Sequence, residues 1–241
     1  MIRKKFQEAQ ANNYKKALAK NLGVSVRKIK DTDSDDTFYG DLEDREFSVN
    51  MGGEEQKYLV LLEDEAREQT VISLENLVDD AGIKVFKGYE YLYESALDEN
   101  AVDEWLFDDF FNYYNDLDNE DSDDFENRLV EEAYELGVLT EDDFEKTDDG
   151  DIDYKKLIDD ENITEECARK RLDEMYWEDK VSLITDYSID GLLDIKDFID
   201  FYEFADNVDK NFGWGHEIAI YDGETNSEEI DGVEYFIFRL E

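Results

Sequence analysis

The chain of 241 residues contains no proline, one cysteine and one histidine, and these shortages exclude several kinds of protein. Cys167 alone cannot form an internal disulfide, and with His216 it is too small a set of ligands for a structural zinc site. The absence of proline leaves no Pro-rich linker to mark a domain boundary. No apolar run approaches the roughly 18 residues of a membrane helix, and the basic start leads into a polar segment, not an apolar signal core. We therefore expect an intracellular protein with no membrane partner.

Catalytic motifs are also missing from the sequence. There is no GxSxG turn, no P-loop and no GxGxxG, and the lone cysteine lies about fifty residues upstream of His216. Paired carboxylates occur everywhere among the 69 acidic residues, so no single pair is marked for acid and base chemistry. The sequence predicts a protein that is not an enzyme and names no catalytic residue.

Positive charge is scarce. The chain has 25 Lys and Arg against 69 Asp and Glu, a formal net charge of −44, although a magnitude of about 2 to 8 keeps a small domain soluble. Residues 1–30 hold nine of the basic residues and one acid, Glu8, so the remainder has a net charge of −52. The basic end either neutralises the acidic body within the fold or contacts a separate partner. Since 41% of the residues are hydrophobic and 14% are aromatic, the chain should nevertheless fold.

The first third of the sequence has both helix and strand patterns. Apolar residues at helical spacing predict a helix over 3–22 that ends before Gly23. The segment 18–29 has the spacing of a helix-turn-helix, but a helix followed by a turn into a strand is favoured, because the acidic run at 31–36 would repel phosphate. Residues 45–50 and 56–62 read as a hairpin, and Ser73 as the N-cap of a short helix that ends before Gly82.

The rest of the chain reads as acidic helices followed by a terminal hairpin. Over 96–210 apolar residues recur at helical spacing while carboxylates occupy the other faces. One helix is expected to start at Thr164, and another to carry Ile195, Phe198, Ile199, Tyr202 and Ala205. Residues 216–221 and 233–240 read as two strands, which places His216 at a strand start.

Together these patterns predict an α+β fold, in which a small antiparallel sheet from the N-terminal strands and the C-terminal hairpin packs with an acidic, mainly helical middle. We expect one interdependent unit over 1–241. Its parts are a basic helix (1–30), an α+β segment (31–95), an acidic helical region (96–210) and a C-terminal β-hairpin (211–241).

One segment, DYSIDGLLDIKD at 186–197, has the ligand spacing of an EF-hand loop. Gly191 stands at loop position 6, but position 12 is an aspartate, which is short for bidentate coordination. A calcium or magnesium site is one interpretation, and a capped turn between two helices is the favoured one, so no cofactor is predicted. The oxygen ligands of such a site would be Asp186, Ser188, Asp190, Asp194 and Asp197.

Three segments carry a resemblance to a known family: ALAKNLGVSVRKI (17–29), KYLVLLEDEA (57–66), and GHEIAIYDGE (215–224) with YFIFR (235–239). The chain resembles a family of acidic, mostly uncharacterised bacteriophage proteins, in which these segments read YLVLTDEEA and GRGHFLSSYDGEE with YYIYR. It departs from that pattern at Leu62, at Trp214 and over 217–220. The resemblance implies a phage protein in the cytoplasm of the infected bacterial host, and it supplies no catalytic residues. In charge and size the chain is also similar to phage and plasmid anti-restriction proteins that mimic DNA.

The charge suggests a function. Proteins that bind DNA use Lys and Arg to displace its counterions, and a dense surface of Asp and Glu offers those cations another partner. We therefore expect a DNA mimic that occupies the nucleic-acid groove of a basic host defence or DNA-processing protein and does not bind nucleic acid itself. The alternatives are a phage assembly protein that uses its basic N-terminal helix, a Ca²⁺-responsive module, or a surface that is charged only for solubility. The expected partner-binding residues are Asp103, Asp108, Asp109, Asp116, Asp121, Asp123, Asp124, Glu131, Glu132 and Glu135.

Overall fold

The computed structural model describes residues 2–32, 37–119, 123–140, 143–146, 152–157 and 163–241. The chain divides into two compact units, where sequence analysis expected one: unit 1 is Met1–Ala96 with Ile199–Glu241, and unit 2 is Leu97–Phe198. Unit 2 is thus inserted into the sequence of unit 1. Within unit 1 the N–H of Asp200 donates to the carbonyl of Ala96, and within unit 2 the N–H of Asp98 donates to the carbonyl of Phe198, both at 2.8 Å. These hydrogen bonds link residues next to one boundary with residues next to the other, in a chain that has no proline.

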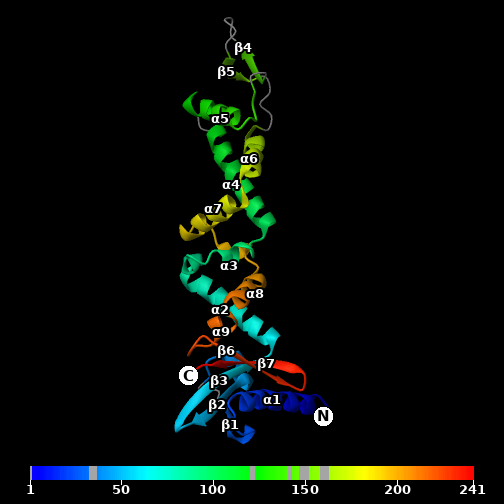
Figure 1. Ribbon diagram of the computed structural model, residues 1–241. Helices are drawn as coiled ribbons and strands as arrows, with labels where there is room; N and C mark the ends of the chain where they lie inside the picture. The colour runs from blue at the N-terminus through cyan, green and yellow to red at the C-terminus, as the bar shows by residue number, and fades with distance from the viewer. Residues whose placement is uncertain (1, 33–36, 120–122, 141–142, 147–151, 158–162) are drawn as a thin grey trace. The chain divides into compact units, whose positions relative to one another are not determined.

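Unit 1 combines a sheet with helices that cover both of its faces (Figure 1). Its helical elements are α1 (Ile2–Asn21), η1 (Val26–Lys28), η3 (Gly40–Arg45), α2 (Glu63–Ala81), η4 (Ile83–Phe86), α3 (Tyr91–Glu94), α8 (Phe201–Phe212) and α9 (Gly215–Ile218). Its strands are β1 (Ile29–Asp31), β2 (Glu46–Met51), β3 (Glu54–Leu61), β6 (Thr225–Ile230) and β7 (Val233–Arg239).

The five strands form one antiparallel sheet in the order β1-β2-β3-β7-β6. The predicted pairing of the N-terminal strands with the C-terminal hairpin is therefore confirmed, and β3 against β7 makes the junction. The hairpin β6-β7 turns at Asp231 and Gly232, whose φ angles are 56° and 80°. Two consecutive positive φ angles are what a two-residue type I′ turn requires, and Asp-Gly is a preferred pair for it.

The apolar run at the end of β3 is buried on both faces of the sheet. Tyr58 and Val60 belong to the core under α1, which contributes Tyr14, Ala17 and Leu18. Leu59 and Leu61 alternate with them and are also fully buried, since α2 packs against β3 and β7. A strand covered on both sides reads as a continuous apolar run, which is why this segment is so hydrophobic.

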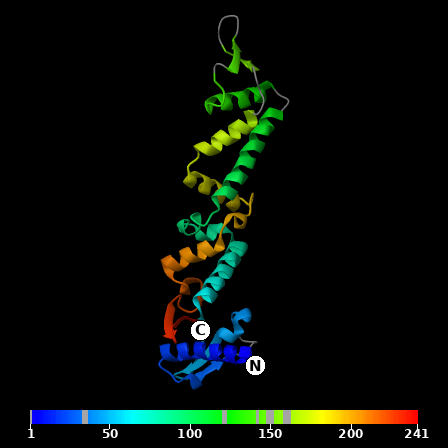
Figure 2. The same cartoon turned by 90° about the vertical axis from the view of Figure 1, so that its right-hand side faces the viewer.

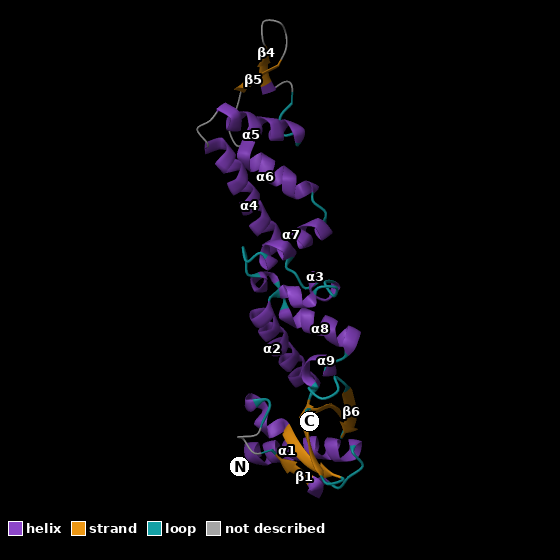
Figure 3. Cartoon of the chain, turned by 90° about the vertical axis from the view of Figure 1, so that its left-hand side faces the viewer, coloured by secondary structure: helices purple, strands orange, loops and turns teal. Residues whose placement is uncertain are grey.

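Unit 2 is a group of helices with a small hairpin (Figures 1 and 3). Its elements are α4 (Glu99–Asn119), α5 (Asp123–Glu135), β4 (Phe144–Lys146), β5 (Ile152–Leu157), α6 (Ile163–Glu174), α7 (Trp177–Ile189) and η6 (Ile195–Phe198). The long helix α4 packs against α5, α6 and α7, and Figure 2 shows α4 and α6 side by side. The apolar residues that face inward include Val102, Leu106 and Phe110 of α4 and Ala168 and Leu172 of α6.

Several sequence expectations are wrong in detail. Ser73 is not an N-cap, because α2 begins ten residues earlier at Glu63. Residues 216–221 are not a strand, since α9 occupies Gly215–Ile218 and the strand that forms the hairpin with β7 is β6 (Thr225–Ile230). The region 96–210 is not helical throughout, because it contains the β4-β5 hairpin. After the first helix η1 leads into β1, so the strand reading of 18–29 is confirmed and the helix-turn-helix is wrong.

Candidate functional site

Negative charge is concentrated in unit 2. Its 102 residues contain 37 acidic and 9 basic residues, a formal net charge of −28, whereas the 139 residues of unit 1 have 32 acidic and 16 basic residues, a net of −16. The carboxylates of unit 2 therefore form the first candidate for a functional surface.

The exposed side of α4 carries a regular row of side chains. Glu104, Asp108, Asn112 and Asp116 are all exposed and follow one another at four-residue spacing. Residues four apart lie on the same face of a helix and are separated by about 6 Å along its axis. This α4 row therefore presents three carboxylates over about 18 Å of helix.

A second row follows the exposed side of α7. Glu178, Ser182, Asp186 and Asp190 have the same spacing and are all exposed. Asp190 is the residue that follows the last turn, and its N–H donates to the carbonyl of Asp186 at 2.9 Å. This α7 row also contains three carboxylates.

Asp186 and Asp190 of the α7 row also belong to the set of possible metal ligands. The expected loop over 186–197 is wrong in its first third, because Asp186 and Ser188 lie in the last turns of α7. Asp194 and Asp197 are exposed, and Asp194 accepts a hydrogen bond from the N–H of Lys196 at 3.1 Å. Among the described residues, no group of three or more His, Cys, Asp and Glu side chains is placed to hold a metal ion.

Three of the predicted partner-binding acids are engaged within unit 2. Asp103 forms an ion pair with Lys180 at 2.7 Å. Asp109 accepts a hydrogen bond from the Tyr187 hydroxyl at 3.1 Å, and the Tyr113 hydroxyl donates to Glu132 at 2.7 Å. These carboxylates fasten α7 and α5 to α4, and a partner would have to compete with those bonds.

Four of the other seven predicted acids are exposed. These four are Asp108, Asp116, Glu131 and Glu135. Asp123 and Asp124 lie in the first turn of α5, and Asp121 lies outside the described residues. The prediction missed exposed carboxylates that the same acidic helical pattern could have indicated: Glu104, Glu165, Glu166, Asp173, Glu174, Glu178 and Asp179.

The four basic side chains of α6 and α7 are engaged within unit 2. Arg169 pairs with Glu165 at 2.8 Å and Lys170 with Glu174 at 3.3 Å, both within α6. Arg171 lies 4.8 Å from the ring centroid of Phe110 and contacts the Tyr114 hydroxyl at 3.5 Å. Lys180, on α7 itself, is tied to Asp103 and its side chain is only 12% exposed.

The basic residues of α1 are partly neutralised within unit 1. Lys15 pairs with Asp31 at 2.7 Å, and Lys20 pairs with Glu228 at 2.6 Å. Tyr14 and Leu18 on the same helix are completely buried against the sheet. The helix is therefore a structural element of unit 1.

His216 and Cys167 have the surroundings of structural residues. His216 lies in α9, stacks on Phe212 at 4.8 Å and contacts Glu217 at 2.6 Å. Cys167 is completely buried in α6, and burial, followed by the charges of Glu132 and Glu166, raises the pKa of its thiol to about 12. A thiol with such a pKa is almost entirely protonated at neutral pH and is a poor nucleophile.

Comparison with known proteins yields no match to a family model, a curated protein or a solved structure. In the described part of the chain, no helix combines the length and the apolar character needed to cross a membrane.

Proposed function

We propose that this chain is an acidic, phage-encoded inhibitor that occupies the nucleic-acid groove of a host defence or DNA-processing enzyme. The observation that carries the proposal is the pair of exposed carboxylate rows on α4 and α7, in a unit whose net charge is −28. The phage origin rests on the resemblance of residues 17–29, 57–66, 215–224 and 235–239 to phage proteins.

The charge density of the rows indicates how such mimicry would work. One DNA strand presents a phosphate about every 3.4 Å along the duplex axis. A row with three carboxylates in four positions presents one about every 8 Å of helix axis, which is less than half that density. Neither row alone matches a strand, so we propose that the target contacts both rows, using Lys and Arg that would otherwise contact phosphates.

Electrostatic mimicry predicts a characteristic dependence on salt. Both partners hold counterions that are released when the complex forms, so affinity should fall as the NaCl concentration rises. No base-specific contact is needed, and duplex DNA of any sequence should compete for the same groove.

The alternative functions have less support. An assembly role for the basic N-terminal helix is weakened because α1 is packed on the sheet and two of its lysines are paired with carboxylates. A Ca²⁺-responsive role is weakened because Asp186 and Ser188 are helical.

A pull-down from nuclease-treated bacterial lysate, eluted along a NaCl gradient, tests the proposal. The test variant is Asp108→Lys, Asp116→Lys and Asp186→Lys, which reverses exposed acids of both rows. The control is Glu55→Lys, Glu203→Lys and Glu234→Lys, which reverses three exposed acids of unit 1. Both variants change the formal net charge from −44 to −38, so only the position of the charge differs.

We expect capture of a nucleic-acid enzyme that is released at moderate salt and by added duplex DNA. Competition with a fluorescent duplex for the purified enzyme should then show at least about tenfold weaker binding for the unit 2 variant, and a change of about twofold or less for the control. Equal effects of the two variants, or a captured enzyme that DNA does not displace, would exclude mimicry by these rows.

A further inference from the structure

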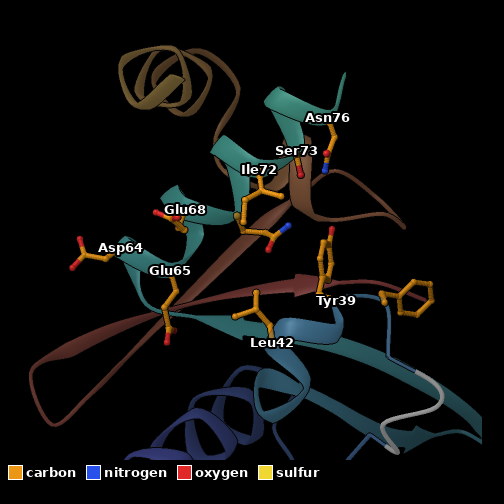
Figure 4. A pocket seen from close by; sticks show the side chains of 10 residues that line it. Tyr39, Leu42, Asp64, Glu65, Glu68, Ile72, Ser73 and Asn76 are labelled. Carbon is orange, nitrogen blue, oxygen red and sulfur yellow. The ribbon is translucent and has the colours of Figure 1, made fainter. Parts of the chain in front are cut away.

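Unit 1 contains a groove of about 660 Å³, which is not part of the acidic site proposed on unit 2. One wall is α2, from Asp64 to Asn76, and the other is formed by Phe38, Tyr39 and Leu42 (Figure 4). Tyr39 and Leu42 point toward α2, and Ile72 faces them from the helix. The volume falls within the range of roughly 300 to 1,000 Å³ that is typical of ligand sites.

The wall opposite α2 is held in place by a buried carboxylate. Glu46 is completely buried at the start of β2 and accepts hydrogen bonds from the backbone N–H groups of Phe38 and Tyr39. The Tyr39 hydroxyl donates to the carbonyl of Ile218 at 3.0 Å, which fixes the ring. Phe38 is 45% exposed and Ile72 is 41% exposed, so the groove has apolar surface open to a ligand.

Three polar side chains of the groove form no hydrogen bond within the described residues. Gln69 is only 8% exposed and lines the groove, yet its side-chain amide makes no hydrogen bond to any described residue. Ser73 and Asn76 follow it at helical spacing on the same wall, and within the described residues their side chains also form no hydrogen bond. The Gln69 amide is not among the buried atoms without a partner, so it is open to the groove, and a bound ligand with hydrogen-bonding groups would replace the water that contacts it.

The groove is negative at one end, and none of the described residues that line it is basic. Asp64, Glu65 and Glu68 gather at the N-terminal end of α2 (Figure 4). Glu65 is occupied by hydrogen bonds from Tyr14, Arg45 and the N–H of Leu62. Asp64 and Glu68 are exposed, and only one oxygen of Glu68 is used, by the Tyr202 hydroxyl at 2.7 Å. These two carboxylates are therefore available to a cation.

The length of the groove indicates an extended ligand. The twelve-residue step from Asp64 to Asn76 corresponds to about 18 Å along α2. An extended peptide spans about 3.3 Å per residue, so about five residues would fill this length. A peptide also brings backbone N–H and C=O groups, which can form hydrogen bonds with the side chains of Gln69, Ser73 and Asn76.

We propose that this groove binds an extended, arginine-bearing peptide segment of a partner protein. The guanidinium pairs with Glu68 and Asp64, an apolar side chain packs on Leu42 and Ile72, and the peptide backbone bonds to Gln69. Arginine suits the site better than lysine because its guanidinium is more weakly hydrated and offers five donors in a planar arrangement that matches carboxylates. The site lies entirely within unit 1 and does not depend on the carboxylate rows of unit 2.

NMR titration of the full chain tests this proposal. The probe is the acetylated and amidated pentapeptide Arg-Ala-Leu-Ala-Arg, whose alternate side chains share one face when it is extended. The signals are the side-chain amides of glutamine, of which the chain has four, and the δ1 methyl of Ile72. Gln56, whose Oε1 accepts from the Tyr58 hydroxyl outside the groove, is the internal control.

Two variants of equal charge distinguish binding in the groove from nonspecific electrostatic attraction of the peptide to an acidic protein. Glu68→Gln removes a carboxylate from the groove, and Glu75→Gln removes an exposed one from the same helix outside it. Tyr202→Phe removes the hydrogen bond to Glu68 without changing the charge, which controls for that contact.

We expect saturable shifts of Gln69 and Ile72 without a shift of Gln56. Binding should weaken about three- to tenfold in Glu68→Gln and remain within about twofold in the other two variants. Absence of shifts, equal binding of the peptide with citrulline in place of arginine, or equal weakening by Glu75→Gln would overturn the proposal. Equally tight binding of acetylarginine amide alone would also overturn it, because the groove would then bind a free cation.

Discussion

Replacement of Glu65 by glutamine should measure how strongly one carboxylate holds three parts of unit 1 together. Glu65 accepts from Arg45 Nε at 3.0 Å, from the Tyr14 hydroxyl at 3.0 and 3.1 Å to its two oxygens, and from the N–H of Leu62 at 2.9 Å. It thereby joins α1, the end of η3 and the start of α2. The side chains of Arg45 and Glu65 are 17% and 25% exposed, so water screens them only in part.

The size of the effect follows from these contacts. Glutamine keeps one carbonyl oxygen for Leu62 but loses the charge that strengthens the bonds from Arg45 and Tyr14. Burial lowers the pKa of Arg45, yet its hydrogen bonds and the charge of Glu65 raise it overall. Because a hydrogen bond to a charged group contributes about 1.5 to 3 kcal/mol, we expect Glu65→Gln to reduce the free energy of unfolding of unit 1 by about 2 to 3 kcal/mol.

Tryptophan fluorescence can isolate unit 1 in this assay. Trp214 is the tryptophan of unit 1 and is 5% exposed, while Trp105 and Trp177 lie in unit 2. In a Trp105→Phe, Trp177→Phe background, urea denaturation followed by fluorescence reports unit 1 alone. A double-mutant cycle with Arg45→Met should give a coupling of at least about 1 kcal/mol. A coupling below about 0.5 kcal/mol would refute the assignment of the stabilisation to this pair.

Three further perturbations test other parts of the structure. Gly215→Ala should reduce the free energy of unfolding of unit 1 by about 3 kcal/mol or more, because the new Cβ would lie 2.5 Å from the carbonyl carbon of Glu224. Gly191→Ala should reduce that of unit 2 by only about 1 to 2 kcal/mol, because its Cβ would enter open space and only the φ of +75° is unfavourable. Similar losses in urea denaturation would contradict the close packing at Gly215. Burial raises the pKa of Cys167 from the ordinary 9 to about 12 in the folded protein. Its contribution to stability is therefore complete below pH 9 and is lost as the pH rises toward 12, because the unfolded chain loses the thiol proton first. Cys167→Ala should therefore flatten the loss of stability between pH 9 and 10, and native Cys167 should resist iodoacetamide at pH 8; rapid alkylation would show that the thiol is accessible. Raising NaCl from 10 to 500 mM should raise the denaturation midpoint of unit 2 more than that of unit 1, since screening relieves the repulsion of its −28 charge. Equal shifts would mean that self-repulsion does not limit the stability of unit 2.

Local patterns predicted much of unit 1 because they coincide with its structure. The helix predicted over 3–22 is α1, and the apolar run at 56–62 is the central strand β3. The glycines at 52 and 53 predicted the β2-β3 hairpin, which forms with continuous register from Glu46 against Leu59 to Met51 against Glu54. These elements are determined by side-chain periodicity and turn chemistry, both of which are local.

The C-terminal segment shows where local patterns are ambiguous. Short apolar runs such as HEIAIY (216–221) fit a strand or a buried helical turn equally well. In the structure Gly215 packs against the backbone at Glu224 and Thr225, and its N–H donates to Thr225 Oγ1 at 2.6 Å. The segment forms the helical turn α9, and this contact joins the start of α9 to the start of β6.

The sequence by itself determined the excess of acid, its position in the helical middle and the α+β class of the fold. Only the tertiary structure decided which carboxylates remain free. Asp103 and Asp109 look like Asp108 in the sequence, yet they are paired with Lys180 and Tyr187, which are 77 and 78 residues away along the chain. The groove beside α2 also depends on a long-range contact, because Tyr39 is fixed by the carbonyl of Ile218, 179 residues away. Charge and periodicity are properties of a local sequence, whereas the pairing of a charge depends on which distant side chains the fold brings to it.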